Sequence, residues 1–319
     1  MTLHPALAGL LRAAHQAGRP PFSACAPGQA RRVFGASCAA LGGGPEVGSI
    51  RDLDIPTRGG AVRGRLFRPP GSPEAQSAGL IVYVHGGGWV VGTPDGFDAL
   101  ARALVVRTEC ALLLVDYRLA PEHPFPAGLE DIEDAIAWTV AYRDDFIEPG
   151  YPLVVAGDSA GANLATVALA EGRASGWTRG VALQVLFYPV ADCDTATTSY
   201  ALPEDTVFLT RADMLWFFRH YAPPELWPDP RISPLRATDL AGLPSAWIAT
   251  AEYDVLRDEA EAYARRLEAD GVAVQLRRFG GMGHGFVRMM NHVADAHAAF
   301  DDVANAIAAS AAGPKGEPE

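Results

Sequence analysis

One short segment of this chain could carry nucleophilic catalysis. Residues Gly157–Gly161 read GDSAG, follow the apolar run 153–156 and open a helix-like pattern. A serine at a tight turn from a strand into a helix presents its hydroxyl at the top of a sheet. The helix N-terminus favours negative charge, and the amide of Ala160 can face a developing oxyanion. The pattern predicts a nucleophile at Ser159 and a turn-forming role for Asp158, although a glycine-rich helix start would look similar.

A second segment could supply hydrogen-bond donors to the same reaction. Residues His85–Trp89 read HGGGW and follow the apolar run 80–84. Three glycines permit positive φ angles, so backbone N–H groups can converge on one point. The segment lacks the spacing of a phosphate-binding loop. An HGGG loop after a strand is the second oxyanion-hole element of lipases and esterases, and His85 is expected to brace it.

A serine nucleophile needs a base, and in this architecture the chain order is serine, acid, histidine. Three histidines follow the last plausible acid: His284, His292 and His297. His284 lies in the glycine-rich segment 280–286 directly after a strand-like run, where its ring can serve both nucleophile and leaving group. The other two lie in a helical pattern. We therefore predict His284 as the base.

Three carboxylates near residue 251 compete for the role of the acid. Asp254 lies in the loop after the strand-like run, where it can point toward His284. Asp258 better fits the first turn of the next helix, where the helix dipole stabilises it. Glu252 could point either way. We predict Asp254 as the acid, which holds the imidazole in one tautomer and stabilises its charged form.

Composition limits the class of protein. The 319 residues are 49% hydrophobic and 20% charged, which is an ordinary globular balance with enough apolar surface for a large core. The 26 Lys and Arg against 38 Asp and Glu give a net charge of −12, which argues against generic binding to nucleic acid or anionic membranes. The four cysteines form no CxxC motif, so neither a metal site nor a disulfide scaffold is expected, although Cys25 and Cys38 could pair.

Targeting signals are also missing from the sequence pattern. No Lys or Arg precedes the first apolar stretch, so the start lacks the basic region of a secretory signal. No apolar run approaches the roughly 18 residues that a membrane span needs. We expect a cytoplasmic protein that does not bind membranes.

The elements that must position these residues alternate between strand and helix. Several apolar runs suit strands buried on both faces of a parallel sheet. The expected strands cover 51–55, 61–68, 80–84, 112–116, 153–157, 182–188, 245–251 and 274–279. The expected helices cover 95–107, 129–142, 160–174, 256–270 and 292–309. This alternation predicts an α/β fold with a mostly parallel eight-stranded sheet flanked by helices.

Two segments break the alternation. Residues 1–50 are rich in Ala, Gly and Pro with a helical stretch at 5–16, and residues 191–230 contain an amphipathic helix at 210–221. Both are expected to form a helical cap over the strand ends, where open α/β sheets place their sites. The predicted organisation is a cap segment 1–50, a core of 51–190 and 231–312, a second cap segment 191–230 and a disordered tail 313–319.

Taken together, these segments resemble the bacterial hormone-sensitive-lipase-like (family IV) carboxylesterases, which have the α/β-hydrolase fold. The resemblance runs from about residue 62 to residue 286. It rests on HGGGW (85–89), DYRLAPEHPFPA (116–127), GDSAGANLA (157–165), YPVAD (188–192), FLTRADM (208–214), AEYDVLRDE (251–259) and GMGHGF (281–286). It implies a catalytic triad and oxyanion-hole donors at Ser159, Asp254, His284, Gly86, Gly87 and Ala160.

Three positions depart from the family's common pattern. Ala162 and Val255 stand where Gly and Pro are frequent, and Gly283 stands where a larger residue often precedes the histidine. Val255 and Gly283 are expected to loosen the loops of the acid and the base. None of the three removes a catalytic group.

The expected function is a serine carboxylesterase that hydrolyses short- to medium-chain esters through an acyl-enzyme, without a cofactor or metal. Its partner would be a small-molecule ester and not a nucleic acid, and a homodimer is left open. Residues that could line the pocket, or simply pack, are Trp89, Phe208, Leu209 and Trp216. An amidase or aryl formamidase could use the same triad. A non-enzymatic ligand receptor of this fold is disfavoured, because such receptors lack the catalytic histidine and His284 is present.

Overall fold

The chain folds around one large mixed sheet. The computed structural model describes residues 2–71 and 77–311, so the tail expected at 313–319 lies outside the described residues. Across the sheet the strands are β1 (Ser49–Thr57), β2 (Gly60–Arg68), β4 (Ala111–Asp116), β3 (Leu80–Val84), β5 (Leu153–Asp158), β6 (Leu183–Phe187), β7 (Ser245–Tyr253) and β8 (Val274–Gly283). The pairs β1–β2 and β2–β4 are antiparallel, and the other neighbours are parallel.

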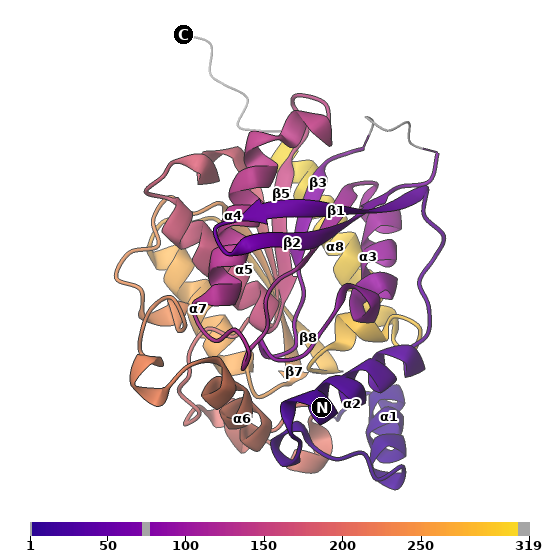
Figure 1. The fold of residues 1–319 in the computed structure, drawn as a ribbon. Coiled ribbons are helices and arrows are strands. Elements are labelled where there is room, and N and C mark those ends of the chain that lie inside the picture. The colour runs from indigo at the N-terminus through magenta and orange to yellow at the C-terminus, as the bar shows by residue number, and fades with distance from the viewer. Residues whose placement is uncertain (1, 72–76, 312–319) are drawn as a thin grey trace.

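The central strands are apolar because both faces of the sheet are covered. Every residue of β3, β5 and β6 is buried. On one face pack α3 (Pro94–Thr108) and α8 (Ala294–Ala311); on the other lie α4 (Ala127–Ala141), α5 (Ala160–Gly172) and α7 (Arg257–Ala269) (Figure 1). The predicted fold class, an eight-stranded and mostly parallel sheet between helices, is confirmed.

Three further helices gather at one end of the sheet. The helices α1 (Pro5–Gln16), α2 (Pro27–Ala40) and α6 (Arg211–Tyr221) lie together at the lower end in Figure 1. α6 begins with a capping box, in which the Thr210 side chain accepts from the Asp213 N–H and Asp213 accepts from the Thr210 N–H. The α2 helix was not among the elements expected from the sequence.

The two segments that carry these helices contact each other, although about 190 residues separate them. The rings of Phe22 and Phe217 lie 5.3 Å apart, and the Ser23 N–H donates to Asp213 Oδ1 at 2.9 Å. Arg31 of α2 reaches the core side, where it donates to the Val90 carbonyl at 2.9 Å and pairs with Glu122. The segment 1–50 is therefore attached both to the segment 191–230 and to the sheet domain.

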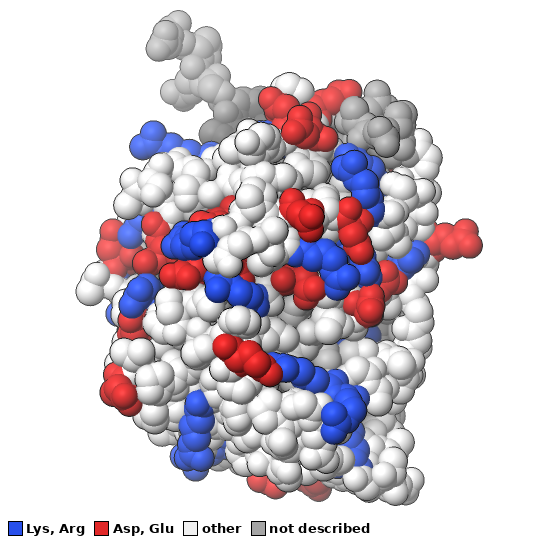
Figure 2. Space-filling view, in the orientation of Figure 1, with Lys and Arg blue, Asp and Glu red and all other residues white. Residues whose placement is uncertain are grey.

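The visible surface mixes charges of both signs. In Figure 2, acidic and basic side chains alternate across the face shown, without a broad basic patch on its described residues. None of the described helices combines the length and the apolar character needed to cross a bilayer.

Candidate active site

The turn between β5 and α5 holds Ser159 in an unusual backbone conformation. Its φ of 56° and ψ of −122° lie in a region that non-glycine residues rarely adopt. Its N–H donates to the Phe187 carbonyl at 2.9 Å, which fixes the turn. A Cβ on Gly161 would lie 2.1 Å from the Val84 carbonyl oxygen, so only glycine lets α5 approach the sheet here. The GDSAG segment thus has the strand–turn–helix geometry that its sequence predicts.

Three residues from the ends of different strands meet beside this turn. His284 follows β8, and its Nε2 lies 3.1 Å from Ser159 Oγ. The other ring nitrogen, Nδ1, lies 2.8 Å from Asp254 Oδ2. Asp254 is fully buried, and its second oxygen accepts from the Leu256 N–H at 3.0 Å. The arrangement can pass a proton from the serine to the imidazole, while the carboxylate stabilises the imidazolium.

The competing carboxylates are occupied elsewhere. Glu252 accepts from the Gly281 N–H at 2.7 Å and so holds the loop that carries His284. Asp258 accepts from the Ser199 N–H at 2.8 Å and pairs with Arg257. Neither has a hydrogen bond to His284, so the geometry separates the three candidates as the sequence did.

His297 takes no part in the triad. Its Nε2 lies 3.1 Å from the Met290 carbonyl oxygen.

The glycine loop presents a different set of donors from the set implied by the resemblance. The Gly86 N–H donates to Asp158 Oδ1 at 2.8 Å, so it is not free to meet an oxyanion. Gly87 and Gly88 have φ angles of 120° and 57° and line the same cavity as Ser159. Their N–H groups, like that of Ala160, donate to no described residue. Gly88 therefore replaces Gly86 in the candidate oxyanion hole.

Asp158 and His85 fix the position of this loop, the first through a hydrogen bond and the second through ring packing. Asp158 is buried and also accepts from the Tyr83 hydroxyl at 3.0 Å. The His85 ring stacks on Phe97 and Tyr117, with centroids 5.2 and 4.5 Å away. Burial lowers the pKa of His85, so the ring is neutral at pH 7. The bracing role expected for His85 fits this packing. The contact of Asp158 with Gly86 joins the two motifs that the sequence analysis expected to serve the same reaction.

A cavity of about 950 Å³ opens above Ser159, and we call it the catalytic cavity. Among the four residues named from the sequence, Phe208 and Leu209 line it, while Trp89 and Trp216 do not. Trp89 is instead stacked flat on Tyr221 of α6, with centroids 4.3 Å apart. Trp216 packs on its helix neighbours. The sequence predicted residues 1–50 as a cap, with Phe22 and Phe34 among its aromatic residues, but it did not identify which residues of 10–41 line the cavity. Prominent in that part are Leu10, Leu11, Arg19, Phe22 and Phe34.

Gly283, which departs from the common family pattern, sits against one of these lining residues. A Cβ at this position would come within 2.9 Å of Phe208 Cδ2. The missing side chain therefore leaves room for the Phe208 ring directly beside the histidine. The departure changes the wall of the catalytic cavity rather than the triad.

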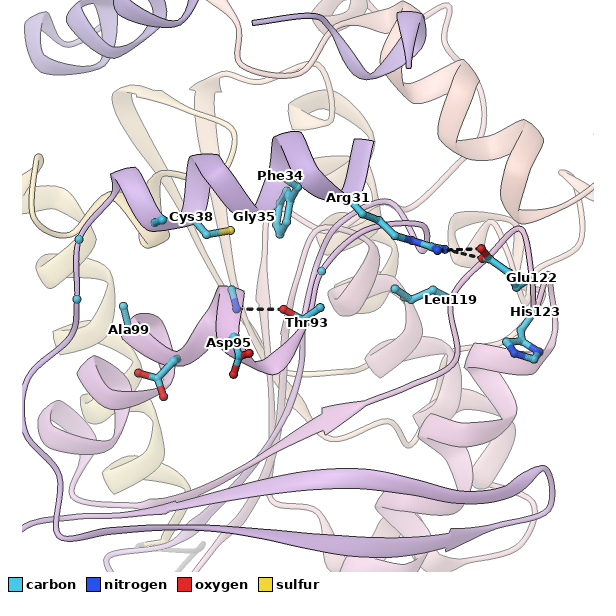
Figure 3. A pocket seen from close by; sticks show the side chains of 16 residues that line it. Arg31, Phe34, Gly35, Cys38, Thr93, Asp95, Ala99, Leu119, Glu122 and His123 are labelled. Atoms are coloured by element: carbon cyan, nitrogen blue, oxygen red, sulfur yellow. Dashed lines mark hydrogen bonds and ion pairs between the residues drawn. The ribbon is translucent and has the colours of Figure 1, made fainter. Parts of the chain in front are cut away.

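A second hollow of about 880 Å³ lies between α2 and α3, and Figure 3 shows the side chains that face it. Arg31, Phe34 and Cys38 point into it from α2, while Thr93 and Asp95 lie at the start of α3. Ser159 is not among its lining residues. We call it the α2–α3 groove. Across residues 2–71 and 77–311, no group of three His, Cys, Asp or Glu side chains has a metal-binding arrangement.

Comparison with known proteins agrees with the fold and the geometry. Residues 81–288 match a family described as having the alpha/beta hydrolase fold. The chain is 40% identical to the carboxylic ester hydrolase LipN of Mycobacterium tuberculosis over 261 residues, 80% of this chain and 68% of that protein. It is 36% identical to the ethyl acetate hydrolase of Pseudomonas putida, covering 93% of this chain and 95% of that one.

Two solved structures give the same result. The hyperthermophilic esterase from Pyrobaculum calidifontis superposes with a TM-score of 0.89 at 36% identity, covering 98% of this chain and 99% of that one. A thermophilic carboxylesterase from a metagenomic library, EstE1, superposes with a TM-score of 0.83 at 38% identity, covering 90% of this chain and 98% of that one. The chain therefore belongs to the α/β-hydrolase family, in the hormone-sensitive-lipase-like group that these esterases represent.

Proposed function

We propose that this protein is a serine carboxylesterase that hydrolyses short- to medium-chain esters with Ser159, His284 and Asp254. One observation carries the proposal: the Oγ of a serine on a positive-φ turn lies 3.1 Å from His284 Nε2, whose other nitrogen lies 2.8 Å from a buried carboxylate. The relatives that share this fold are named as esterases, which supports the same reaction.

In the proposed mechanism, Ser159 Oγ attacks the ester carbonyl while His284 takes its proton. The carbonyl oxygen becomes negatively charged and accepts hydrogen bonds from the backbone N–H groups of Gly87, Gly88 and Ala160. His284 then protonates the leaving alcohol, and the acyl group stays on the serine. A water molecule, deprotonated by the same histidine, releases the acid. Of the groups used in these steps, Ser159, His284, Gly87 and Gly88 line the catalytic cavity.

We also propose that residues 1–50 and 191–230 act as the cap that shapes the substrate pocket. The lining of the catalytic cavity draws on both segments as well as on the triad loops, which supports this role. A mainly apolar wall of this kind buries part of an acyl chain and excludes water from the reacting bond. Because the catalytic cavity has a limited volume, we expect a preference for acyl groups of about two to eight carbons, each buried CH₂ adding about 0.8 kcal/mol until the space is full.

The proposal is tested with a chromogenic acyl ester, the matched anilide and a fluorophosphonate. We expect ester hydrolysis and one phosphonyl group per chain, attached to Ser159. Ser159→Ala should fold normally and lose about 10³-fold or more in kcat/KM. Stoichiometric labelling at another serine would contradict the assignment. Faster turnover of the anilide than of the ester would favour an amidase instead.

A further inference from the structure

Two guanidinium groups line the catalytic cavity, and neither has a carboxylate partner. Arg19 and Arg288 both belong to the lining that includes Ser159 and His284. Among residues 2–71 and 77–311, no Asp or Glu lies within ion-pair distance of either one. Other arginines of this acidic chain do pair, as Arg58 does with Asp134 at 2.7 Å. Arg288 is partly buried, and an arginine charge removed from bulk water without a counter-ion is costly unless something else compensates it, whereas Arg19 is exposed.

Arg288 is held in place by contacts that leave its charge unneutralised. Its guanidinium carbon lies 4.5 Å from the centroid of Phe34 and 4.6 Å from that of Phe97, so the group is sandwiched between two rings. Nη2 donates to Cys38 Sγ at 2.7 Å and reaches the Gly96 carbonyl at 3.5 Å. Nε and Nη1 donate to no described residue. The side chain is thus fixed in orientation while two of its nitrogens remain available.

The position of Arg288 relates it directly to the reacting groups. It lies four residues after His284, in the short helical turn Phe286–Met289 that continues from the histidine loop. Its charge is felt at the nucleophile turn, because burial raises the pKa of Asp158 and Arg288 opposes that rise. Arg19 is more exposed and lies near Phe22, 5.8 Å from the ring centroid, at the mouth of the cavity.

The acidic residues of the same lining form no ion pair with either arginine, although Asp213 attracts Arg19: burial lowers the pKa of Arg19 and the charge of Asp213 opposes this. Asp158 accepts from Tyr83 and Gly86, as described above. Both oxygens of Asp213 are occupied, one by the Ser23 N–H and the other by Thr210. The remaining acids, Glu204 and Asp205, are exposed at the rim, where water and salt screen their charge. Among the described residues of this lining, the charged groups that still have free donors are therefore the two arginines.

We propose that Arg288 inside the catalytic cavity, together with Arg19 at its mouth, binds an anionic group of the substrate, so that the enzyme favours esters carrying a carboxylate away from the scissile bond. The inference rests on the proposed esterase function and adds a substrate class to it. A guanidinium binds a carboxylate through charge-assisted hydrogen bonds, which are about twice as strong as neutral ones. The carboxylate could belong to the acyl part or to the alcohol part of the ester, since both must occupy this cavity.

The test compares matched substrates that differ only in charge. The acyl arm uses nitrophenyl half-esters of six- to eight-carbon dicarboxylic acids, each paired with the same compound capped as a methyl ester. The alcohol arm uses 4-acetoxybenzoate and its methyl ester. The quantity measured is the ratio of kcat/KM for the anionic substrate to that for its neutral partner, in the wild type and in Arg288→Met, Arg288→Lys and Arg19→Met.

We expect Arg288→Met to lower this ratio about tenfold or more in one arm, as the loss of a charge-assisted hydrogen bond predicts. Arg288→Lys should restore part of the ratio, and Arg19→Met should lower it less, with an effect that fades as salt is added. The matched control is Arg277→Met. Arg277 also stacks on a phenylalanine, 4.4 Å from the centroid of Phe279, but it pairs with Asp302 and lies outside the cavity. Its ratio should equal that of the wild type.

Failure of this inference can be distinguished from failure of the esterase proposal. Normal turnover of the neutral esters, with a ratio that Arg288→Met leaves unchanged in both arms, would overturn the inference and leave the esterase function standing. Calorimetric binding of the same dicarboxylic acids to Ser159→Ala makes the comparison without any chemistry. Binding that does not weaken when Arg288→Met is added would overturn the inference whatever the hydrolysis assays show.

Discussion

The two oxygens of Asp254 have different roles: one contacts the catalytic histidine, and the other accepts a backbone hydrogen bond. One lies 2.8 Å from His284 Nδ1, and the other accepts the Leu256 N–H at the start of α7. The second hydrogen bond orients the carboxylate even before the imidazole becomes charged. A buried anion held in this way gains most of its stabilising effect when the imidazolium forms. Asp258, only four residues later, is engaged with Ser199 and Arg257.

This difference predicts unequal effects for two similar substitutions. Asp254→Asn should lower kcat by about 10²–10⁴, because the amide cannot stabilise the imidazolium or hold the required tautomer. Asp258→Asn should lower kcat far less and act mainly on stability. The measurement is kcat on one soluble ester, with circular dichroism to confirm folding. A larger loss for Asp258→Asn would make that residue the acid.

Phe208 is the residue for which the cavity geometry makes a prediction about substrate length. Its ring occupies the space that Gly283 leaves open beside His284. Phe208→Ala should extend the catalytic cavity and raise kcat/KM for acyl chains longer than about eight carbons, by up to roughly fourfold per added CH₂ that becomes buried. A series from two to twelve carbons measures this in both proteins. Identical length profiles would show that Phe208 does not bound the acyl site.

Single residues also show how far the sequence could be interpreted. Ser159, Asp254 and His284 were identifiable because motif, chain order and strand ends all restrict them. The error at Gly86 arose because all three glycines of the loop look alike in sequence. Only the fold shows that the N–H of the first glycine, Gly86, donates to Asp158, 72 residues away. The sequence left Trp89 open between lining the pocket and simply packing, and in the structure its ring stacks on Tyr221.

At the scale of elements, the catalytic cavity depends on α1 and α2, two helices that form no part of the hydrogen-bonded sheet. The helices α1 and α2 bury Leu7, Leu11 and Phe34 against the molecule. They also supply much of the cavity wall. Their attachment includes the Arg31–Glu122 pair and two hydrogen bonds from Asn291 to the carbonyls of Leu41 and Gly43.

Removing the first 45 or so residues should therefore separate folding of the sheet from activity. We expect the truncated chain to keep its sheet, to bind a hydrophobic dye more strongly and to lose at least about tenfold in kcat/KM, because the cavity opens to water. Kinetics and dye fluorescence measure the two effects. Wild-type kcat/KM in a folded truncated chain would contradict the proposed role of the segment as a cap.

The elements were predicted unevenly for physical reasons. Buried strands such as β3 and β5 are continuous apolar runs, which identifies them without ambiguity. The helix α2 escaped prediction because its sequence, PGQARRVFGASCAA, contains two glycines and buries only Ala30 and Phe34. Strand β8 continues to Gly283 rather than ending near residue 279, and its pairing with β7 shifts register before Tyr253 pairs with Gly283.

Over the whole molecule, among the described residues, arginines stabilise several carboxylates in their charged form. The Arg31 hydrogen bond lowers the pKa of Glu122 to about 2, and Arg65 likewise lowers the pKa of Asp52. A depressed pKa contributes stability above the ordinary range of a carboxyl group, and that contribution is lost as the pH falls through the folded-state pKa. The net charge of −12 adds general repulsion near neutral pH.

The pKa of Glu259 is shifted in the opposite direction, upward. It is fully buried at the start of α7, where Oε1 accepts the N–H groups of Ala191 and Asp192 at 3.0 and 3.3 Å and Oε2 has no partner among the described residues. Burial raises its pKa well above the usual range, so the folded state retains this proton at pH values where the unfolded chain has lost it. Stability from this group therefore falls as the pH rises above about 4.5, by up to about 1.4 kcal/mol per pH unit.

Glu259→Gln should make that pH dependence visible, because glutamine keeps the size and the acceptor but does not titrate. Relative to the wild type, the variant should gain stability as the pH rises above about 5 in urea unfolding experiments. Glu261→Gln, on the same helix, is the matched control. Burial acts to raise the pKa of Glu261, but its ion pair with Arg278 outweighs this and the pKa is lowered. Its substitution should cost stability at pH 7, and this cost should shrink as the pH falls toward 4. A constant offset between Glu259→Gln and the wild type at every pH would mean that Glu259 is ionised in the folded protein, and that the junction of α7 with residues 191–192 holds a buried charge after all.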